Sequence, residues 1–510
     1  MQRLNLLLPV LALGCSPTLF QPTPCESSDQ CANVFGAGAT CDVDGYCALG
    51  NEDFVDGVSA GAVRTVGIAD VTGSLQDLGG GMRDGVLAAL QAHNRDNPSA
   101  RQFLHDTLDD AYDPQISVSN LRSVLDGDGV NEGRSHFAVL GGMGSPTTSA
   151  MLPVINSNQV PLFGTYSGAE HLRATPPDRV VFNTRASYRL EGEAIGRYLL
   201  HRTPVVTQIA PDNVFVFAQS ALTIETNGLT DIGATAEDDL DPYGLSGFLG
   251  IRDALREAGQ DNADIALASY RATNTDTSIA SDYFFRWLLG LERLKPDIPE
   301  SGQVRIGVAM VPVASAATPF VKEVIDGLAD IEQGKPPPGV SAQEWADTPA
   351  TVKSQLQQAQ VVITSISPVG DQLAANLRNS NAAKYCQGAD GRQPVIVSQV
   401  VPFPTGGSAG AVQYRQDLEA YDPNLDPGFV SFEGWIAGRA WVEAVLATGD
   451  DLSVDTLVAT LEDPSFSVNV GEVLSFSPDD HDGSDSVYGS IIDVGCTYVD
   501  YSRLNDLNPQ

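Results

Sequence analysis

The chain has 510 residues, of which 42% are hydrophobic and 18% charged, a composition typical of folded globular proteins that excludes an intrinsically disordered chain. This length predicts more than one structural unit. The 65 acidic and 29 basic residues give a formal net charge of -36, and a surface this acidic repels phosphate backbones, so nucleic-acid binding is not expected.

The N-terminus has the pattern of an export signal. Arg3 precedes an apolar run over residues 4–13, which is too short to span a bilayer but suits the core of a signal peptide over residues 1–14. The run ends in Ala-Leu-Gly before Cys15, which resembles the lipobox of bacterial lipoproteins. That resemblance implies a lipid on Cys15 as the only membrane anchor of a protein facing the periplasm. The alternative is an ordinary signal peptide with a chance cysteine.

The other six cysteines are consistent with an oxidising compartment. Four of them lie close together, in a segment over residues 15–60 that is too poor in aliphatic residues to build a core. These four are Cys25, Cys31, Cys41 and Cys47. Two disulfides in any of three pairings are favoured over a zinc site, because the spacing lacks C-x-x-C pairs. Cys386 and Cys496 are candidates for a third disulfide, with two separate buried thiols as the alternative.

Buried-strand runs alternate with amphipathic helices from Val63 onward, which predicts parallel sheets covered on both faces. The first set has expected strands at 63–69, 103–108, 136–140 and 160–164, and helices at 80–93, 114–125 and 149–157. The second set has expected strands at 213–217, 265–270, 304–311, 360–365 and 394–398, and helices at 191–200, 247–258, 319–328 and 432–447. Two such sets predict two lobes, with ligands bound beyond the carboxyl ends of the strands. The long connection over residues 220–240 is either functional or a mobile insertion.

Several segments in this order carry a resemblance to a known family. Three of these segments each join a strand to a loop, namely GIADVTGSLQDLGGGMRDGVLAALQAHN (67–94), LDDAYDP (108–114) and VLGGMGSPTTSAMLPVINSNQVPLFG (139–164). Four further segments follow in the chain, namely VVFNTRASYRLEGEAIGRYL (180–199), DPYGLSGFLGIRDALREAG (241–259), SQVVPFP (398–404) and FEGWIAGRAWVEAV (432–445). Together they resemble the type I periplasmic solute-binding proteins, the leucine/isoleucine/valine-binding family, from Val63 to Gly495.

The resemblance implies an α/β fold with two Rossmann-like lobes joined by a hinge, preceded by the small Cys-rich module. Lobe 1 is expected over residues 61–185 and 361–465, and lobe 2 over residues 186–360, with C-terminal strands over residues 466–500 returning to it. The implied function is a lipid-anchored protein that binds a small amino acid or related carboxylate and passes it to an ABC permease. The alternative is a ligand-sensing receptor of the same fold.

Two loops are expected to hold the carboxylate of the ligand. In the family, hydroxyls and backbone amides at a helix start do so, and Ser145, Thr147 and Thr148 match that position. The alternative is that Ser145 and Thr148 are only N-caps. Thr165 and Ser167 match the second loop, where the alternative is a turn with local hydrogen bonds.

Further candidates lie at the cleft mouth and on lobe 2. Thr72 is expected at the mouth, and Tyr243 matches an aromatic residue that faces the ligand, with packing at a helix start as its alternative. Branched-chain binders place a glutamate after the residue matching Tyr270 to pair the ligand ammonium, but here Arg271 follows. An arginine cannot pair an ammonium. Either the register differs, another acid substitutes, the ligand is not an α-amino acid, or Arg271 lies outside the cleft.

The sequence argues against an enzyme. G-x-S-x-G and H-E-x-x-H motifs are absent, and the six histidines are scattered. The glycines at 79–81 lack the G-K-[ST] ending of a phosphate loop. The aspartates at 479–485 miss the register of a calcium loop, so a surface turn is favoured. No cofactor or metal is therefore predicted.

Overall fold

The computed structural model describes residues 27, 39–41, 47–49, 54–126, 133–200, 209–221, 235–260, 265–271, 276–290, 304–380, 385–386 and 395–503. The predictions for residues 1–14 and for Cys15, Cys25 and Cys31 lie outside these residues. Cys41 and Cys47 are backbone partners in a hairpin of β1 (Ala39–Cys41) and β2 (Cys47–Leu49), without described side chains. Disulfides in the N-terminal cluster thus stay a prediction.

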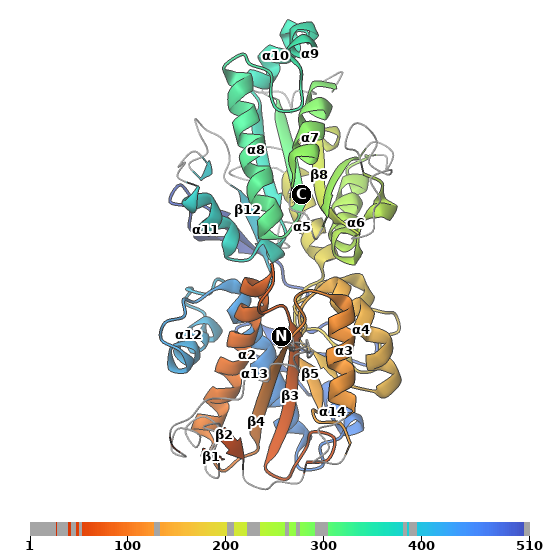
Figure 1. Cartoon of the computed structure of the whole chain (residues 1–510), viewed down its shortest axis with the longest axis vertical. Helices are drawn as coiled ribbons and strands as arrows, with labels where there is room; N and C mark the ends of the chain where they lie inside the picture. The colour runs from red at the N-terminus through yellow and green to blue at the C-terminus, as the bar shows by residue number, and fades with distance from the viewer. Residues whose placement is uncertain are drawn as a thin grey trace, which may run out of the picture.

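The predicted pair of lobes is confirmed, and Figure 1 shows one lobe above the other. The lower lobe, lobe 1, holds a five-stranded parallel sheet in the order β4-β3-β5-β6-β7. The strands are β3 (Ala62–Ala69), β4 (Gln102–Asp109), β5 (Ala138–Leu140), β6 (Leu162–Phe163) and β7 (Val181–Phe182). Strand β3 is buried along nearly its whole length, as expected for a parallel strand covered on both faces.

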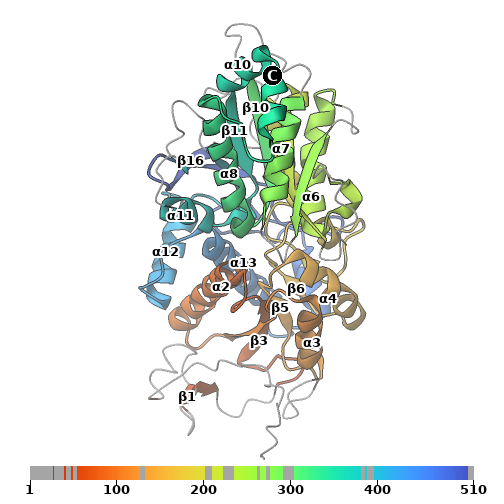
Figure 2. The ribbon, with the colours of Figure 1, turned by 45° about the horizontal axis from the view of Figure 1, so that its top comes forward.

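Helices from two distant parts of the chain cover the lobe 1 sheet. Helices α2 (Gln76–Asp96), α3 (Pro114–Leu125) and α4 (Ser145–Asn158) follow its strands. Helices α12 (Ala409–Tyr421), α13 (Phe429–Thr448) and α14 (Val454–Leu461) return from the C-terminal part of the chain. Helix α13 lies alongside α2, and α3 lies alongside α4 (Figure 2). Trp441 of α13 is fully buried against Phe137 and Phe163, which anchors this helix in the core of lobe 1.

Lobe 2 holds a seven-stranded sheet in the order β16-β15-β12-β11-β10-β8-β9. The strands are β8 (Val214–Ser220), β9 (Ala266–Arg271), β10 (Arg305–Val311), β11 (Gln360–Ser365), β12 (Ile396–Gln399), β15 (Tyr488–Ile492) and β16 (Tyr498–Arg503). Its helices are α5 (Tyr188–Leu200), α6 (Pro242–Glu257), α7 (Ser278–Gly290), α8 (Ala314–Glu332), α9 (Ala342–Asp347), α10 (Ala350–Gln357) and α11 (Gln372–Asn379). Strands β8 to β12 are parallel, and β15 and β16 add an antiparallel edge.

The predicted division of the C-terminal half differs from the structure. Strands β11 and β12, within the segment 361–465 expected in lobe 1, continue the lobe 2 sheet beside β10. The hairpin of β13 (Val468–Asn469) and β14 (Val473–Leu474), expected in lobe 2, packs on α12 of lobe 1 through Val470 and Gly410. A buried apolar strand suits either sheet equally well, so its pattern did not reveal which sheet it joins.

The turn expected at residues 479–485 packs on lobe 1 rather than lying free on the surface. His481 is 5% exposed and stacks on Phe182, and Asp482 pairs with Arg173 at 3.2 Å. No group of residues able to hold a metal ion occurs in the described part of the chain, and no described helix is long and apolar enough to cross a membrane.

The disulfide Cys386–Cys496 is present, with its Cα atoms 5.1 Å apart, and it ties the β15–β16 turn to the segment before β12. It closes a loop with a sequence separation of 110 residues, so it strongly restricts the unfolded chain. We expect the double substitution Cys386→Ser/Cys496→Ser to lower the free energy of unfolding by about 2–5 kcal/mol in urea titrations. An unchanged urea midpoint would show that the bridge does not stabilise the protein.

Candidate ligand-binding site between the lobes

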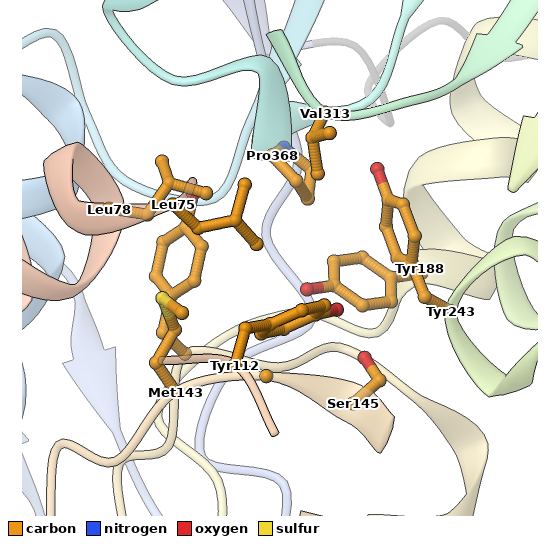
Figure 3. A pocket seen from close by; sticks show the side chains of 11 residues that line it. Leu75, Leu78, Tyr112, Met143, Ser145, Tyr188, Tyr243, Val313 and Pro368 are labelled. Carbon is orange, nitrogen blue, oxygen red and sulfur yellow. The ribbon is translucent and has the colours of Figure 1, made fainter. Parts of the chain in front are cut away.

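A cavity lies between the two lobes, at the carboxyl ends of their parallel strands, and Figure 3 shows its lining side chains. The space between its atoms is about 280 Å³, open solvent included, and the centre of a water molecule can occupy about 20 Å³ of it. The lining residues are Leu75, Leu78, Tyr112, Met143, Gly144, Ser145, Tyr166, Tyr188, Tyr243, Val313 and Pro368. Lobe 1 and the first chain crossing supply the residues up to Tyr188, and lobe 2 supplies the other three. A site at this edge of the sheets fits the general rule for open α/β folds.

The polar end of the cavity is at the start of α4. Ser145 is the first residue of this 14-residue helix and is 2% exposed, and its Oγ lies 2.9 Å from the Oγ of buried Ser167. The preceding Gly144 has φ 102°, and a Cβ there would lie 2.5 Å from Thr147 Oγ1 and 2.8 Å from the Tyr112 ring. Only glycine fits this turn. The helix start therefore presents the Ser145 hydroxyl, with Ser167 bonded to it, and a positive dipole end.

Four tyrosines form walls of the cavity. The rings of Tyr188 and Tyr243 meet edge to face with centroids 4.9 Å apart, and the Tyr243 hydroxyl donates to the Pro312 carbonyl at 2.9 Å. Tyr112 has a left-handed backbone with φ 62°, a strained conformation that often marks functional sites. Burial raises the pKa of Tyr112, Tyr166 and Tyr243 well above its usual value, so these phenols stay neutral.

A buried ion cluster lies directly behind two of these rings. The guanidinium of Arg185, 0% exposed, sits 5.1 Å from the Tyr166 ring centre and 4.8 Å from that of Tyr188. It donates to Glu191 Oε1 at 2.7 Å and to Glu433 Oε1 at 3.1 Å. Because Glu433 belongs to α13 of lobe 1 and Glu191 to α5 of lobe 2, this cluster joins both lobes at the hinge.

Lobe 2 completes the hydrogen bonding of the cluster. Ser367 donates to Glu191 through its backbone N–H at 2.8 Å and its hydroxyl at 2.9 Å, and Ser398 Oγ donates to the same carboxylate at 2.6 Å. Burial raises the pKa of Glu433 to about 7 although the charge of Arg185 opposes the shift. Burial lowers the pKa of Arg185, but the charges of Glu433, Tyr188 and Glu191 outweigh it and hold that pKa above its usual value.

Known proteins share this two-lobed fold. Residues 63–279 match the model of the family described as periplasmic binding protein. The crystal structure of a possible leucine/isoleucine/valine-binding protein from Rhodopirellula baltica SH 1 is 24% identical. The match covers 88% of this chain and 98% of that one, with a TM-score of 0.64. The chain therefore has the fold of the type I periplasmic binding proteins.

Two further structures of this fold contain ligands. A branched-chain amino acid ABC transporter protein from Thermus thermophilus with bound valine is 14% identical, with coverage of 87% and 96% and a TM-score of 0.59. A solute-binding ABC transporter protein from R. palustris in complex with benzoate is 12% identical, with coverage of 87% and 96% and a TM-score of 0.59. The search of curated proteins found no match to this sequence.

The structure brings three of the predicted ligand residues of this chain together. Ser145 and Tyr243 line the cavity, and Ser167 bonds to Ser145. Ser145 is not the N-cap of α4, because Gly144 occupies that position. Thr165 is 2% exposed, does not line the cavity, and its hydroxyl has no hydrogen-bond partner among the described residues. Ligand contact by these residues stays a prediction.

The remaining predicted residues point elsewhere. Thr147 donates to the Met143 carbonyl at 2.6 Å, and Thr148 donates to the Gly144 carbonyl at 2.6 Å, so both hydroxyls bond to the backbone just before α4. Thr72 is exposed and bonds to Asp109. Arg271, at the end of β9, does not line the cavity. In this conformation none of them contributes to the walls of the site.

Sequence reasoning missed most of the aromatic wall. Tyr112 and Tyr166 follow β4 and β6, so the rule that ligands bind beyond the carboxyl ends of parallel strands could have identified them. Tyr188 instead begins α5, at the first chain crossing between the lobes. The pairing of Arg185 with Glu433 spans 248 residues and had no local signal.

The raised pKa of Glu433 predicts a pH-dependent effect of the substitution Glu433→Gln. Between the usual value of 4.5 and about 7 the folded protein keeps a proton that the unfolded chain has lost, so this group contributes less stability as the pH rises. We expect the variant to gain stability relative to the native protein between pH 5 and 8. Urea unfolding of both proteins at several pH values measures the difference between their free energies of unfolding. The protonation of other buried groups affects both proteins alike and cancels in this difference. A difference that is constant with pH would contradict the raised pKa.

Proposed function

We propose that this chain binds a small solute between its lobes and delivers it to an ABC-type importer, as a lipid-anchored protein facing the periplasm. The cavity lined by residues of both lobes carries the proposal, because a ligand there contacts the two halves at once. The ligands of the similar proteins, valine in one and benzoate in another, support a small solute of the amino-acid or carboxylate kind.

The mechanism is closure of the lobes on the solute. The present conformation already has bonds between the lobes, from Glu170 N–H to Ser246 Oγ at 3.1 Å and from Phe429 N–H to Asp371 Oδ2 at 3.1 Å. A solute larger than a water molecule needs the lobes to move apart from this arrangement. A solute that then contacts Ser145 and Tyr243 together favours a closed form over an open one by its extra contacts. A permease that recognises the closed form then receives the loaded protein.

Binding is tested by thermal unfolding with a panel of amino acids, small carboxylates and amides. A solute present at 100 times its dissociation constant stabilises the protein by about 2.7 kcal/mol. We expect the native protein to respond, and Ser145→Phe, which fills the cavity, to lose the response. Ser157→Phe, on the exposed last turn of the same helix, is the matched control and keeps it. Equal shifts in all three proteins would place binding outside the cavity.

Delivery and anchoring need separate tests. The ATPase activity of an ABC permease encoded beside this chain, reconstituted in lipid vesicles, should rise on addition of the loaded protein. A loaded protein without effect would contradict import and favour sensing. Membrane fractionation of Cys15→Ser tests the anchor: the variant should leave the membrane fraction, and its retention there would contradict lipidation.

A further inference from the structure

The walls of the cavity favour an apolar body in the ligand. Figure 3 shows Leu75, Leu78 and Met143 together on one side of the cavity and Ser145 on the other, with Tyr112 between them. Burying apolar groups of a ligand against these side chains is favourable in proportion to the buried area, and aromatic rings gain further from edge and stacking contacts with tyrosine.

The opposite end suits an anionic group. Ser145 and Ser167 place two hydroxyls beside the start of α4, whose dipole attracts negative charge. Arg185, behind the rings of Tyr166 and Tyr188, is paired with Glu191 and Glu433, so the helix start and the hydroxyls alone supply the attraction for the anion. A ligand that extends from Ser145 toward Leu75 therefore places a carboxylate at one end and apolar carbon at the other.

The carboxylates closest to these walls are already engaged by the protein. Asp241 accepts from Gly244 N–H at 2.8 Å and from Gln219 Nε2 at 2.6 Å. Glu191 and Glu433 both pair with Arg185. A ligand ammonium would need one of these groups to exchange its present partner, because a buried ammonium without a partner is strongly unfavourable.

The tyrosine rings do not readily replace these carboxylates as partners of a ligand ammonium. An ammonium can bind over the face of a tyrosine ring, but the guanidinium of Arg185 already lies over the rings of Tyr166 and Tyr188. The position at which branched-chain binders carry an acid is Arg271 here, and this residue does not line the cavity.

We propose that the cavity selects a small apolar or aromatic monocarboxylate and discriminates against the α-amino acid of the same shape. The inference rests on the proposed function and names the class of solute for that site. Isothermal titration calorimetry with matched pairs tests it. The pairs are 4-methylpentanoate with leucine and 3-phenylpropanoate with phenylalanine, and 4-methylpentanamide provides the neutral comparison.

We expect at least one carboxylate to bind about tenfold or more tightly than its amino acid and than the amide. Ser145→Ala should weaken that carboxylate about tenfold, whereas the matched control Ser157→Ala should bind like the native protein. The inference is overturned if the amino acid or the amide binds as tightly as the carboxylate, or if no compound of the panel binds. An amino acid that binds and is lost in Ser145→Phe would overturn the solute class alone. Binding unchanged in Ser145→Phe would also overturn the proposed site.

Discussion

Replacing Arg185 with methionine is expected to lower the free energy of unfolding by about 3–5 kcal/mol, because it leaves Glu191 and Glu433 buried without their cation. Methionine is similar in length and adds no charge, so the loss reports mainly on the uncompensated carboxylates. Urea unfolding at pH 8, above the raised pKa of Glu433, gives the largest effect, because both carboxylates are then ionised.

The matched control for this substitution is Arg179→Met. Arg179 pairs with Asp455 on the surface, where the two side chains are 43% and 86% exposed. Exposed pairs of this kind contribute about 0–1 kcal/mol. If both substitutions cost the same, the buried cluster would not be the element that joins the lobes at the hinge.

The second large effect is expected at Gly85, where α2 crosses α13. A Cβ on Gly85 would collide with the carbonyl oxygen of Ser431 and lie 2.7 Å from the backbone nitrogen of Trp435. Backbone atoms of a packed helix cannot move aside easily, so Gly85→Ala should destabilise the protein by about 3 kcal/mol or more.

Gly80 on the same helix provides the comparison. A Cβ there would meet no atom within 4 Å, so Gly80→Ala should stabilise the protein by about 0.5–1 kcal/mol through the higher helix propensity of alanine. Thermal unfolding of the two variants measures both effects. A Gly85→Ala variant as stable as the native protein would show that α2 and α13 are not packed as described.

The fold could be predicted further than the site. Buried strands such as β3 and capped helices such as α6, where the Asp241 side chain accepts from Gly244 N–H, carry local signals that periodicity and capping rules detect. The lobe to which β11 belongs depends on which sheet its edge meets, and no local pattern encodes that choice. The same limit applies to Arg185 and Glu433, which meet only after both lobes have formed.

At the site, the sequence identified the loops that border the cavity, but not the contacts that their side chains make. The family resemblance predicted Ser145, Ser167 and Tyr243 as ligand residues, and the structure brings these three together. The hydroxyl of Thr147 bonds to the carbonyl of Met143 just before its helix, because a threonine early in a helix readily bonds to a preceding carbonyl.

A crystal structure of the protein with the tightest ligand of the calorimetric panel tests the central claim most directly. The account predicts ligand density in the interlobe cavity, with a ligand oxygen within hydrogen-bonding distance of Ser145 Oγ and the ligand body against Tyr243. Density elsewhere, for example in the groove between Gln413 and Arg439 of lobe 1, with the interlobe cavity empty, would contradict it.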